Sequence, residues 1–337
     1  EIANASLLDE STAAAEAMTL ASRVGKSKSQ KFFIDENCFP QTIAVVSARA
    51  KPIGIKVVVG DPITLESLSE ETYFGALIQY PNNHGEICDF TSVISSLHSH
   101  NALVIMATDL MALTLIKSPG ELGADIAIGS SQRFGVPLGF GGPHAAFMAT
   151  KEAYKRSLPG RLVGASIDEH GKTAYRLALQ TREQHIRREK ATSNICTAQA
   201  LLAIMAGFYA AYHGPEGLKQ IAQSINAHTV RLAKKITEQG FEIISNAFFD
   251  TICINTHSYT NDIIKAAQAK KINIRCISSN SVSISLDETT SELDVKELAS
   301  LFADFEVTNP IDNKYGIPNA LERTSTYLTH PVFHLYR

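Results

Sequence analysis

The sequence has no tryptophan, few cysteines and no long apolar run. Its 337 residues include five cysteines, an odd number, and no two of them have the CxxC spacing of a zinc or redox site. This argues against a secreted disulfide framework and for a reducing compartment. No apolar run reaches the roughly 18 residues that a membrane-spanning helix needs. The chain opens with neither methionine nor a signal peptide, so we expect an N-terminal portion to precede it.

An excess of charge of one sign is also missing. The chain has 31 lysines and arginines against 34 aspartates and glutamates, for a net charge of −3. Without a basic surplus, the composition gives no indication of binding to nucleic acid or to an anionic membrane. With 45% hydrophobic and 19% charged residues, the chain has the composition of an ordinary globular protein, and its length fits about two domains.

Apolar segments of strand length alternate with helical segments in the first part of the chain. This alternation predicts βαβ units and a mostly parallel sheet that is covered by helices. The sequence His213-Gly214-Pro215 marks a predicted boundary, and a compact α+β pattern follows it. We therefore predict a large α/β domain, a small α+β domain and a linker at residues 1–212, 213–306 and 307–337. Strands of the large domain are predicted at residues 31–35, 55–59, 73–80, 103–106, 126–128 and 145–149.

A glycine-rich loop joins the last two of these strands. Its four glycines, at 135, 139, 141 and 142, allow positive φ angles and close approach of another group. Pro137 and Pro143 fix the path of the loop. Shaped loops between buried strands are frequent places for binding sites, so we take this loop as the starting point for function.

The run Gly-Ser-Ser-Gln-Arg-Phe-Gly-Val-Pro-Leu-Gly-Phe-Gly-Gly-Pro-His at residues 129–144 resembles the N-terminal half of glycine decarboxylase, the P-protein of the glycine cleavage system. A charged run at residues 181–203 resembles the same family, and the resemblance covers essentially the whole chain. It implies one of two related halves, each with the aspartate aminotransferase fold (fold-type I) of pyridoxal-phosphate (PLP) enzymes. That fold has a large α/β domain with a mostly parallel sheet and a small α+β domain.

The resemblance also implies that the cofactor lysine is missing here. In the family's catalytic half, the same loop carries the lysine that forms the PLP Schiff base. Alignment on Phe134 puts Gln132 at that position, and an amide cannot act as the nucleophilic amine. The neighbouring Arg133 stays protonated and cannot replace it. We therefore expect no covalently bound PLP, no metal and no decarboxylase activity in this chain alone.

Several residues are candidates for a vestigial cofactor pocket. Ser11 and Thr12 stand at a predicted helix N-terminus, where this class of enzymes holds the cofactor phosphate, although a plain N-cap explains them as well. Asp109 follows a strand near the place of the aspartate that pairs with the pyridine nitrogen, or it caps a helix predicted at residues 110–116. The candidate pocket comprises Ser11, Thr12, Asp109, Ser131 and Gln132.

A second set of candidates is charged. As structure, those from residue 182 onward belong to a solvated segment whose ion pairs contribute less than about 1 kcal/mol each. As function, the arginines of that segment form a contact surface for the other half or for an acidic partner, and the whole set is a candidate for an interface or a substrate tunnel. The set comprises Arg133, His144, Arg182, His185, Arg187 and Arg188.

For the complete enzyme, the resemblance implies that glycine loses CO2 with PLP as electron sink and passes its aminomethyl group to the lipoyl arm of H-protein. This chain is expected to support the catalytic C-terminal half within a homodimer, in the bacterial cytoplasm or the mitochondrial matrix. Two alternatives stay open. One is a PLP enzyme whose lysine lies elsewhere, at Lys117 or Lys151, and the other is a stand-alone scaffold that keeps a phosphate near Ser11 and Thr12.

Overall fold

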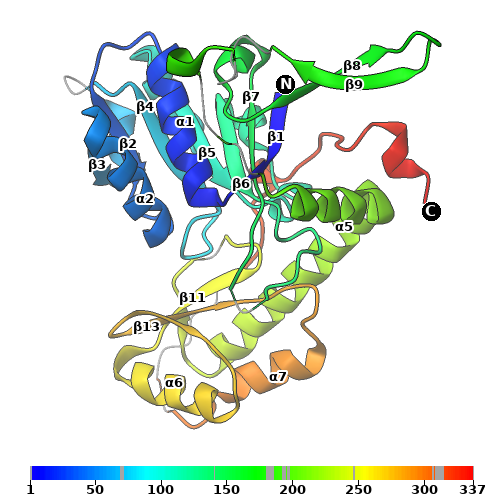
Figure 1. Ribbon diagram of the computed structural model, residues 1–337. Helices are drawn as coiled ribbons and strands as arrows, with labels where there is room; N and C mark the ends of the chain where they lie inside the picture. The colour runs from blue at the N-terminus through cyan, green and yellow to red at the C-terminus, as the bar shows by residue number, and fades with distance from the viewer. Residues whose placement is uncertain are drawn as a thin grey trace. The chain divides into compact units, whose positions relative to one another are not determined.

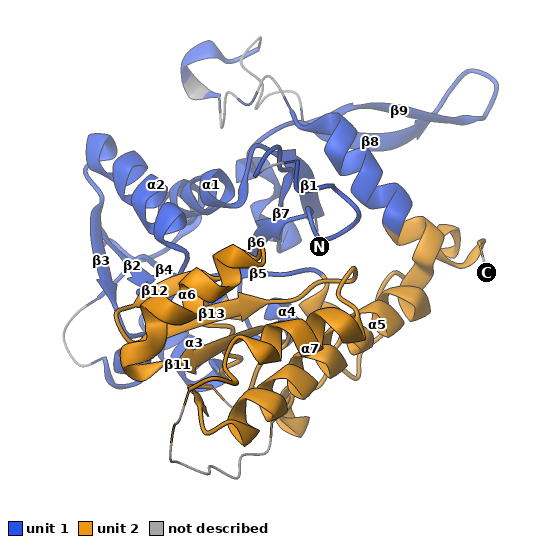
Figure 2. Ribbon diagram, turned by 90° about the horizontal axis from the view of Figure 1, so that it is seen from below, with its two compact units in different colours: residues 1–79, 90–110, 118–209 blue, residues 80–89, 111–117, 210–337 orange. Residues whose placement is uncertain are grey.

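The computed structural model describes residues 2–68, 72–139, 141–179, 186–191, 195, 198–245, 247–305, 307 and 315–336. The chain forms two compact units (Figure 2). Unit 1 comprises residues 1–79, 90–110 and 118–209, and unit 2 comprises residues 80–89, 111–117 and 210–337. Unit 2 thus takes in two short segments from early in the chain, which a boundary near residue 212 does not anticipate.

Unit 1 is built on a seven-stranded sheet with the strand order β1-β7-β6-β5-β4-β2-β3 (Figure 1). Strand β2 pairs in parallel with β3 and β4, and β5 pairs in parallel with β6. Strand β7 is antiparallel to both of its neighbours, β6 and β1. The predicted mostly parallel sheet is therefore confirmed. Its strands are β1 (Ile2–Leu7), β2 (Lys31–Asp35), β3 (Lys56–Gly60), β4 (Gly75–Tyr80), β5 (Leu103–Thr108), β6 (Ile126–Ser130) and β7 (Ala146–Thr150).

The central strands are apolar at nearly every position because helices cover the sheet. All six residues of β4 are buried, and so are all but the first of β5. Strand β6 approaches β5 closely at Gly129, where a Cβ atom would lie 2.2 Å from the carbonyl oxygen of Thr108. Only glycine permits that contact.

The helices of unit 1 are α1 (Glu10–Val24), α2 (Pro40–Ala50), α3 (Thr91–Ser99) and α4 (Pro119–Leu122). Helix α1 packs against α2 and against strands β5, β6 and β7 (Figure 1). Its buried face is rich in alanine, so the helix axis can come close to the sheet. Apolar side chains from α1 and the sheet form one core cluster, which includes Met18, Leu20, Phe32, Ile105, Ile128 and Met148.

Shorter elements complete this part of the chain. Strands β8 (Leu162–Ile167) and β9 (Thr173–Ala178) form an antiparallel ribbon. Turns of 3-10 helix lie at Lys51–Ile53, Pro62–Ser67, Glu152–Ser157 and Arg188–Lys190. The prediction of a helix at residues 110–116 is wrong, because only a 3-10 turn forms there, at Ala112–Thr114.

Unit 2 contains a four-stranded antiparallel sheet with the order β10-β11-β13-β12. Its core is rich in aromatic residues, and the rings of Phe241 and Phe302 meet edge to face with centroids 5.2 Å apart. The elements are β10 (Glu242–Ile243), β11 (Thr251–Asn255), α6 (Thr260–Ala269), β12 (Arg275–Ser278), β13 (Ser281–Ser285) and α7 (Glu292–Ser300), with 3-10 turns at His257–Tyr259, Asn319–Leu321 and Pro331–His334.

Helix α5 (Ala200–Glu238) begins in unit 1 and continues in unit 2. It is interrupted at Gly214, whose φ of 61° and ψ of 179° are not helical, directly before Pro215. Proline has no N–H to donate to the preceding turn, so the break occurs where the sequence predicted a boundary. In the described ranges, no helix combines the length and the apolar character required to cross a membrane.

Candidate functional site

Polar side chains gather where the parallel strands of unit 1 end. Strand β2 ends at Asp35, β5 at Thr108 with Asp109 next, and β6 at Ser130 with the Gln132-Arg133 pair shortly after it. Helix α1 also begins at this edge, because it follows β1 directly. Ligands of open α/β sheets bind outside the carboxyl ends of the strands, so this edge is the candidate site.

An ion pair stands at the centre of this edge. Nη1 of Arg133 lies 3.2 Å from Oδ2 of Asp109, and both side chains are less than a quarter exposed. From the sequence, Asp109 was predicted near the position of the aspartate that pairs with the pyridine nitrogen in this class of enzymes. In the structure the carboxylate of Asp109 contacts a guanidinium of its own chain.

Glu10, in the first turn of α1, was not predicted as a site residue. Burial raises the pKa of its carboxyl from 4.5 to about 8, and the negative charges of Asp109 and Asp9 add to the shift. Its Oε1 atom is buried and accepts no hydrogen bond from the residues that the structure describes. The Glu10 side chain is therefore protonated and neutral at neutral pH.

The N-terminus of α1 is occupied by the protein's own groups. Asp9 is the N-cap, and its carboxylate accepts a hydrogen bond from the backbone N–H of Thr12 at 2.7 Å. The hydroxyl of Ser11 is buried against that of Thr42, at 3.1 Å. Of the groups predicted to bind an anion, the backbone N–H of Thr12 thus already has an anionic partner. The hydroxyl of Ser11 is used in the packing of α1 against α2.

A second buried carboxyl lies at the end of β2. Asp35 accepts hydrogen bonds from the backbone N–H groups of Asn37 and Gln79, at 2.8 and 3.3 Å. Burial nevertheless raises the pKa of its carboxyl to about 6. Asp35 and Gln79 were not predicted either, although both stand at strand ends, which is the signal that could have identified them.

The glycine-rich loop is held by its own backbone and by a tyrosine of α5. The side-chain nitrogen Nε2 of Gln132 donates to the carbonyl of Val136 at 3.1 Å. The hydroxyl of Ser131 donates to the carbonyl of Ala145 at 3.0 Å. Gly135 has a φ of 74°, and a Cβ atom there would lie 2.5 Å from the ring of Tyr209. The Gln132 side chain therefore stabilises the loop rather than pointing free into a pocket.

The two alternative lysines lie elsewhere. Lys151 follows β7, and because β7 runs antiparallel to β6, Lys151 is at the amino edge of the parallel strands. Its Nζ lies 2.6 Å from Oδ1 of Asp125, the residue that precedes β6. Lys117 belongs to unit 2, where its backbone N–H donates to Leu321. Within unit 1, Lys151 therefore lies at the opposite edge of the sheet from Gln132.

The remaining charged candidates are only partly covered by the structure. His144 is half-buried in the loop between β6 and β7, and Arg187 and Arg188 are exposed. Arg182 and His185 lie outside the described residues. Their proposed role at an interface or tunnel stays a prediction.

The sheet order and the smaller antiparallel unit define the fold class, which is that of fold-type I PLP-dependent enzymes. A solved NifS-like protein shares this fold with a TM-score of 0.61, over 90% of this chain and 81% of that chain, at 13% identity. Within the class, the model of the glycine cleavage system P-protein family matches residues 1–302, and the chain belongs to this family.

Two other proteins are more similar to this chain in sequence, and they are named glycine dehydrogenase and glycine decarboxylase. The glycine dehydrogenase (decarboxylating) of Rhizobium meliloti strain 1021 is 55% identical over all of this chain, which covers 35% of that protein. A crystal structure of glycine decarboxylase (P-protein) in inhibitor-bound form has a TM-score of 0.83 and 32% identity, over 90% of this chain and 71% of that chain. The chain thus spans about a third of the length of the curated relatives that it matches.

The fold class raises the question of whether this site could hold PLP. Gln132 offers no amine, Asp109 is paired with Arg133, and Asp9 already caps the helix that would receive the phosphate. A dianionic phosphate would also meet the carboxylate of Asp9. The residues at this edge therefore do not fit the cofactor.

Proposed function

We propose that this chain is the N-terminal half of a glycine dehydrogenase (aminomethyl-transferring, decarboxylating) and that it supports catalysis without holding PLP. The observation that supports this proposal most directly is that Gln132 stands where the catalytic half has its lysine. The side-chain amide of Gln132 is hydrogen-bonded within its own loop. The family membership and the name of the Rhizobium relative support the overall activity. PLP belongs to the rest of the protein, where a lysine can hold it.

In this proposal the complete enzyme takes glycine as substrate, releases its carboxyl as CO2 and transfers the aminomethyl group to one sulfur of the oxidised lipoyl disulfide of H-protein. The other sulfur is reduced to a thiol, which makes the reaction an oxidoreduction. The contribution of this chain is to bind the catalytic half and to form part of the route by which glycine and the lipoyl arm reach PLP. The complete protein acts as a homodimer in the bacterial cytoplasm, or in the mitochondrial matrix of a eukaryote.

An exposed apolar face on the first part of α5 is the surface that we assign to the catalytic half. Leu201, Ile204 and Phe208 are spaced three and four residues apart, so they lie on one face of the helix. Their exposed fractions are 70%, 53% and 72%. Large apolar side chains in a row on an exposed helix mark an interaction surface. The relatives have about twice as much further chain available to cover it, since this chain covers 35% of them.

The first test maps the cofactor in the complete protein. Borohydride reduction of the full-length holoenzyme, followed by digestion and mass spectrometry, fixes the pyridoxyl group to its lysine. We expect that lysine to lie outside this 337-residue sequence. A stoichiometric adduct on Lys117, Lys151 or any other lysine of this chain would make it a PLP enzyme in its own right.

The second test addresses the apolar face of α5. Phe208→Glu is expected to leave the chain folded but to abolish both association with the separately produced catalytic half and glycine decarboxylation by the mixture. Gln223→Glu adds the same charge at an exposed position of the same helix and is expected to change neither. If the two variants associate equally with the catalytic half, the apolar face of α5 is not part of the interface.

A further inference from the structure

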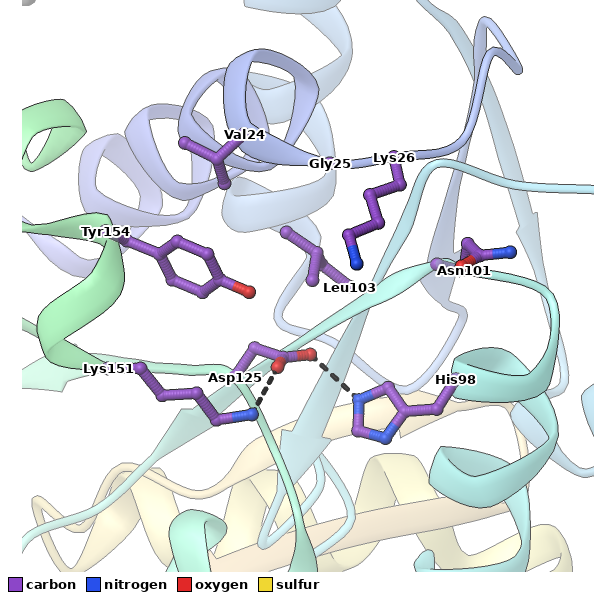
Figure 3. A pocket seen from close by; sticks show the side chains of 10 residues that line it. Val24, Gly25, Lys26, His98, Asn101, Leu103, Asp125, Lys151 and Tyr154 are labelled. Carbon is purple, nitrogen blue, oxygen red and sulfur yellow. Dashed lines mark hydrogen bonds and ion pairs between the residues drawn. The ribbon is translucent and has the colours of Figure 1, made fainter.

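A cavity of about 330 Å³ lies at the amino edge of the sheet of unit 1 (Figure 3). The end of α1, the start of β5 and the residues just before β6 and just after β7 border it. It is therefore at the opposite edge from the cluster of Glu10, Asp109 and Arg133, and the proposed function makes no use of it. Its volume is near the lower end of ligand pockets, which span roughly 300 to 1,000 Å³.

The floor of the cavity is built around a buried carboxylate. Asp125 is only 5% exposed. Its Oδ1 accepts from Nζ of Lys151 at 2.6 Å, and its Oδ2 accepts from the backbone N–H of Val104 and contacts Nε2 of His98, both at 2.9 Å. These hydrogen bonds outweigh the effect of burial and lower the pKa of the Asp125 carboxyl. Asp125 is thus an anion that already has its partners and holds Lys151 and His98 in place.

Two further donors reach into the space above Asp125. Figure 3 shows the ammonium group of Lys26 and the hydroxyl of Tyr154 pointing toward its centre from two sides. Burial raises the pKa of the Tyr154 hydroxyl, with a further contribution from Asp125, so this group remains a donor. Lys26 forms no ion pair with any of the described residues, and it is exposed at the mouth of the cavity. The cavity therefore has more donors than acceptors.

The charges limit what can satisfy these donors. Lys26 and Lys151 carry two positive charges against the single negative charge of Asp125. Helices α1 and α3 both end at this edge, and their C-terminal carbonyls add partial negative charge, about half an elementary charge each. Because Asp125 neutralises Lys151 and the helix carbonyls offset much of the charge of Lys26, the cavity can accommodate one negative charge beside Lys26 but not two. An ammonium group would meet both lysines, which disfavours an amino acid.

The walls of the cavity are apolar. Val24, Leu103 and the ring of Tyr154 flank the converging donors. We propose that this cavity binds a small organic monocarboxylate, with its carboxylate between Lys26 and Tyr154 and its aliphatic body against Val24 and Leu103. The site is independent of the PLP chemistry assigned to the other half, so it can be tested on the chain by itself.

Calorimetric titration of the 337-residue chain with butyrate and with butyramide tests the charge requirement. The two probes have nearly the same shape and differ in one negative charge. Butyrate is expected to bind with a Kd on the order of 1 mM, as befits a ligand of so few atoms, and butyramide to give no binding. Equal binding of the two probes, no binding of butyrate, or tighter binding of inorganic phosphate than of butyrate would overturn the proposal.

Two variants locate the binding in this cavity. Lys26→Met and Tyr154→Phe each remove one donor while keeping the bulk of the side chain, and each is expected to weaken butyrate binding about tenfold. Lys28→Met removes an exposed lysine two residues further on and is expected to bind as the parent does. If Lys26→Met and Tyr154→Phe both bind butyrate as Lys28→Met does, the carboxylate is not bound here.

Discussion

Replacing Glu10 with glutamine is expected to stabilise unit 1 at alkaline pH and to have little effect at acid pH. In the native state the Glu10 carboxyl keeps its proton up to a pKa of about 8, whereas the same group ionises near 4.5 when it is free. Between these two values the unfolded chain releases a proton that the folded chain retains. The free energy of unfolding therefore falls as pH rises from about 4.5 through about 8. Glutamine has the same shape and does not titrate, so this loss disappears.

The size of the effect follows from the shift. One pKa unit corresponds to about 1.4 kcal/mol, so a rise from 4.5 to about 8 corresponds to an upper limit of about 5 kcal/mol above pH 8. Relaxation of the fold around the ionised carboxylate lowers this limit, and Glu10 as a residue is only partly buried. We therefore expect a gain of about 1 to 2 kcal/mol at pH 9 and close to none at pH 5.

Hydrogen exchange followed by mass spectrometry can measure this gain in unit 1 alone. Peptides from α1 and β5 of the parent and of Glu10→Gln are compared at the same pH, so the intrinsic exchange rates cancel. Glu36→Gln, which removes an exposed carboxylate of the same unit, controls for the loss of one charge. An equal difference at pH 5 and pH 9, or a loss of protection in Glu10→Gln at pH 9, would refute the reasoning.

Four other substitutions probe the same structure. Asp109→Asn removes the second cause of the high pKa of Glu10. In a chain that carries Asp109→Asn, Glu10→Gln is therefore expected to stabilise unit 1 less at pH 9. The same hydrogen-exchange experiment measures this difference. Gly85→Ala is expected to cost about 3 kcal/mol or more in urea unfolding, because its φ is 84° and a Cβ atom would lie 2.0 Å from a carbonyl oxygen of β11. Gly171→Ala, at a φ of 74° with open space around it, is expected to cost only about 1 kcal/mol, and equal costs would contradict the clash. Gln132→Lys is expected to give no pyridoxyl-lysine after incubation with PLP and borohydride, and labelling at that position would show that the pocket still accepts PLP.

The sequence predicted those features that depend on neighbouring residues. Apolar runs of strand length predicted six of the seven strands in the sheet of unit 1, all but β1. The position of Gln132 at the place of the lysine stays a prediction from the loop motif. The apolar run at residues 110–116 was misread because helical spacing cannot by itself distinguish a helix from a buried turn. Glu10 was missed because its pKa depends first on burial and then on Asp109, about a hundred residues later, and both follow only from the folded structure. The edge on which Lys151 lies depended on the direction of β7, which no local pattern gives.

The absence of the lysine and the presence of the Arg133–Asp109 pair are physically linked. Where PLP is present, the family resemblance implies that an aspartate near this place is balanced by the cofactor's pyridine nitrogen. A largely buried carboxylate without a positive partner is costly, so Asp109 needs one in the absence of the cofactor. Arg133 provides that charge at 3.2 Å, and Glu10 avoids a third negative charge by staying protonated. A lysine at position 132 alone is therefore not expected to restore a cofactor site, because Asp109 is already paired with Arg133.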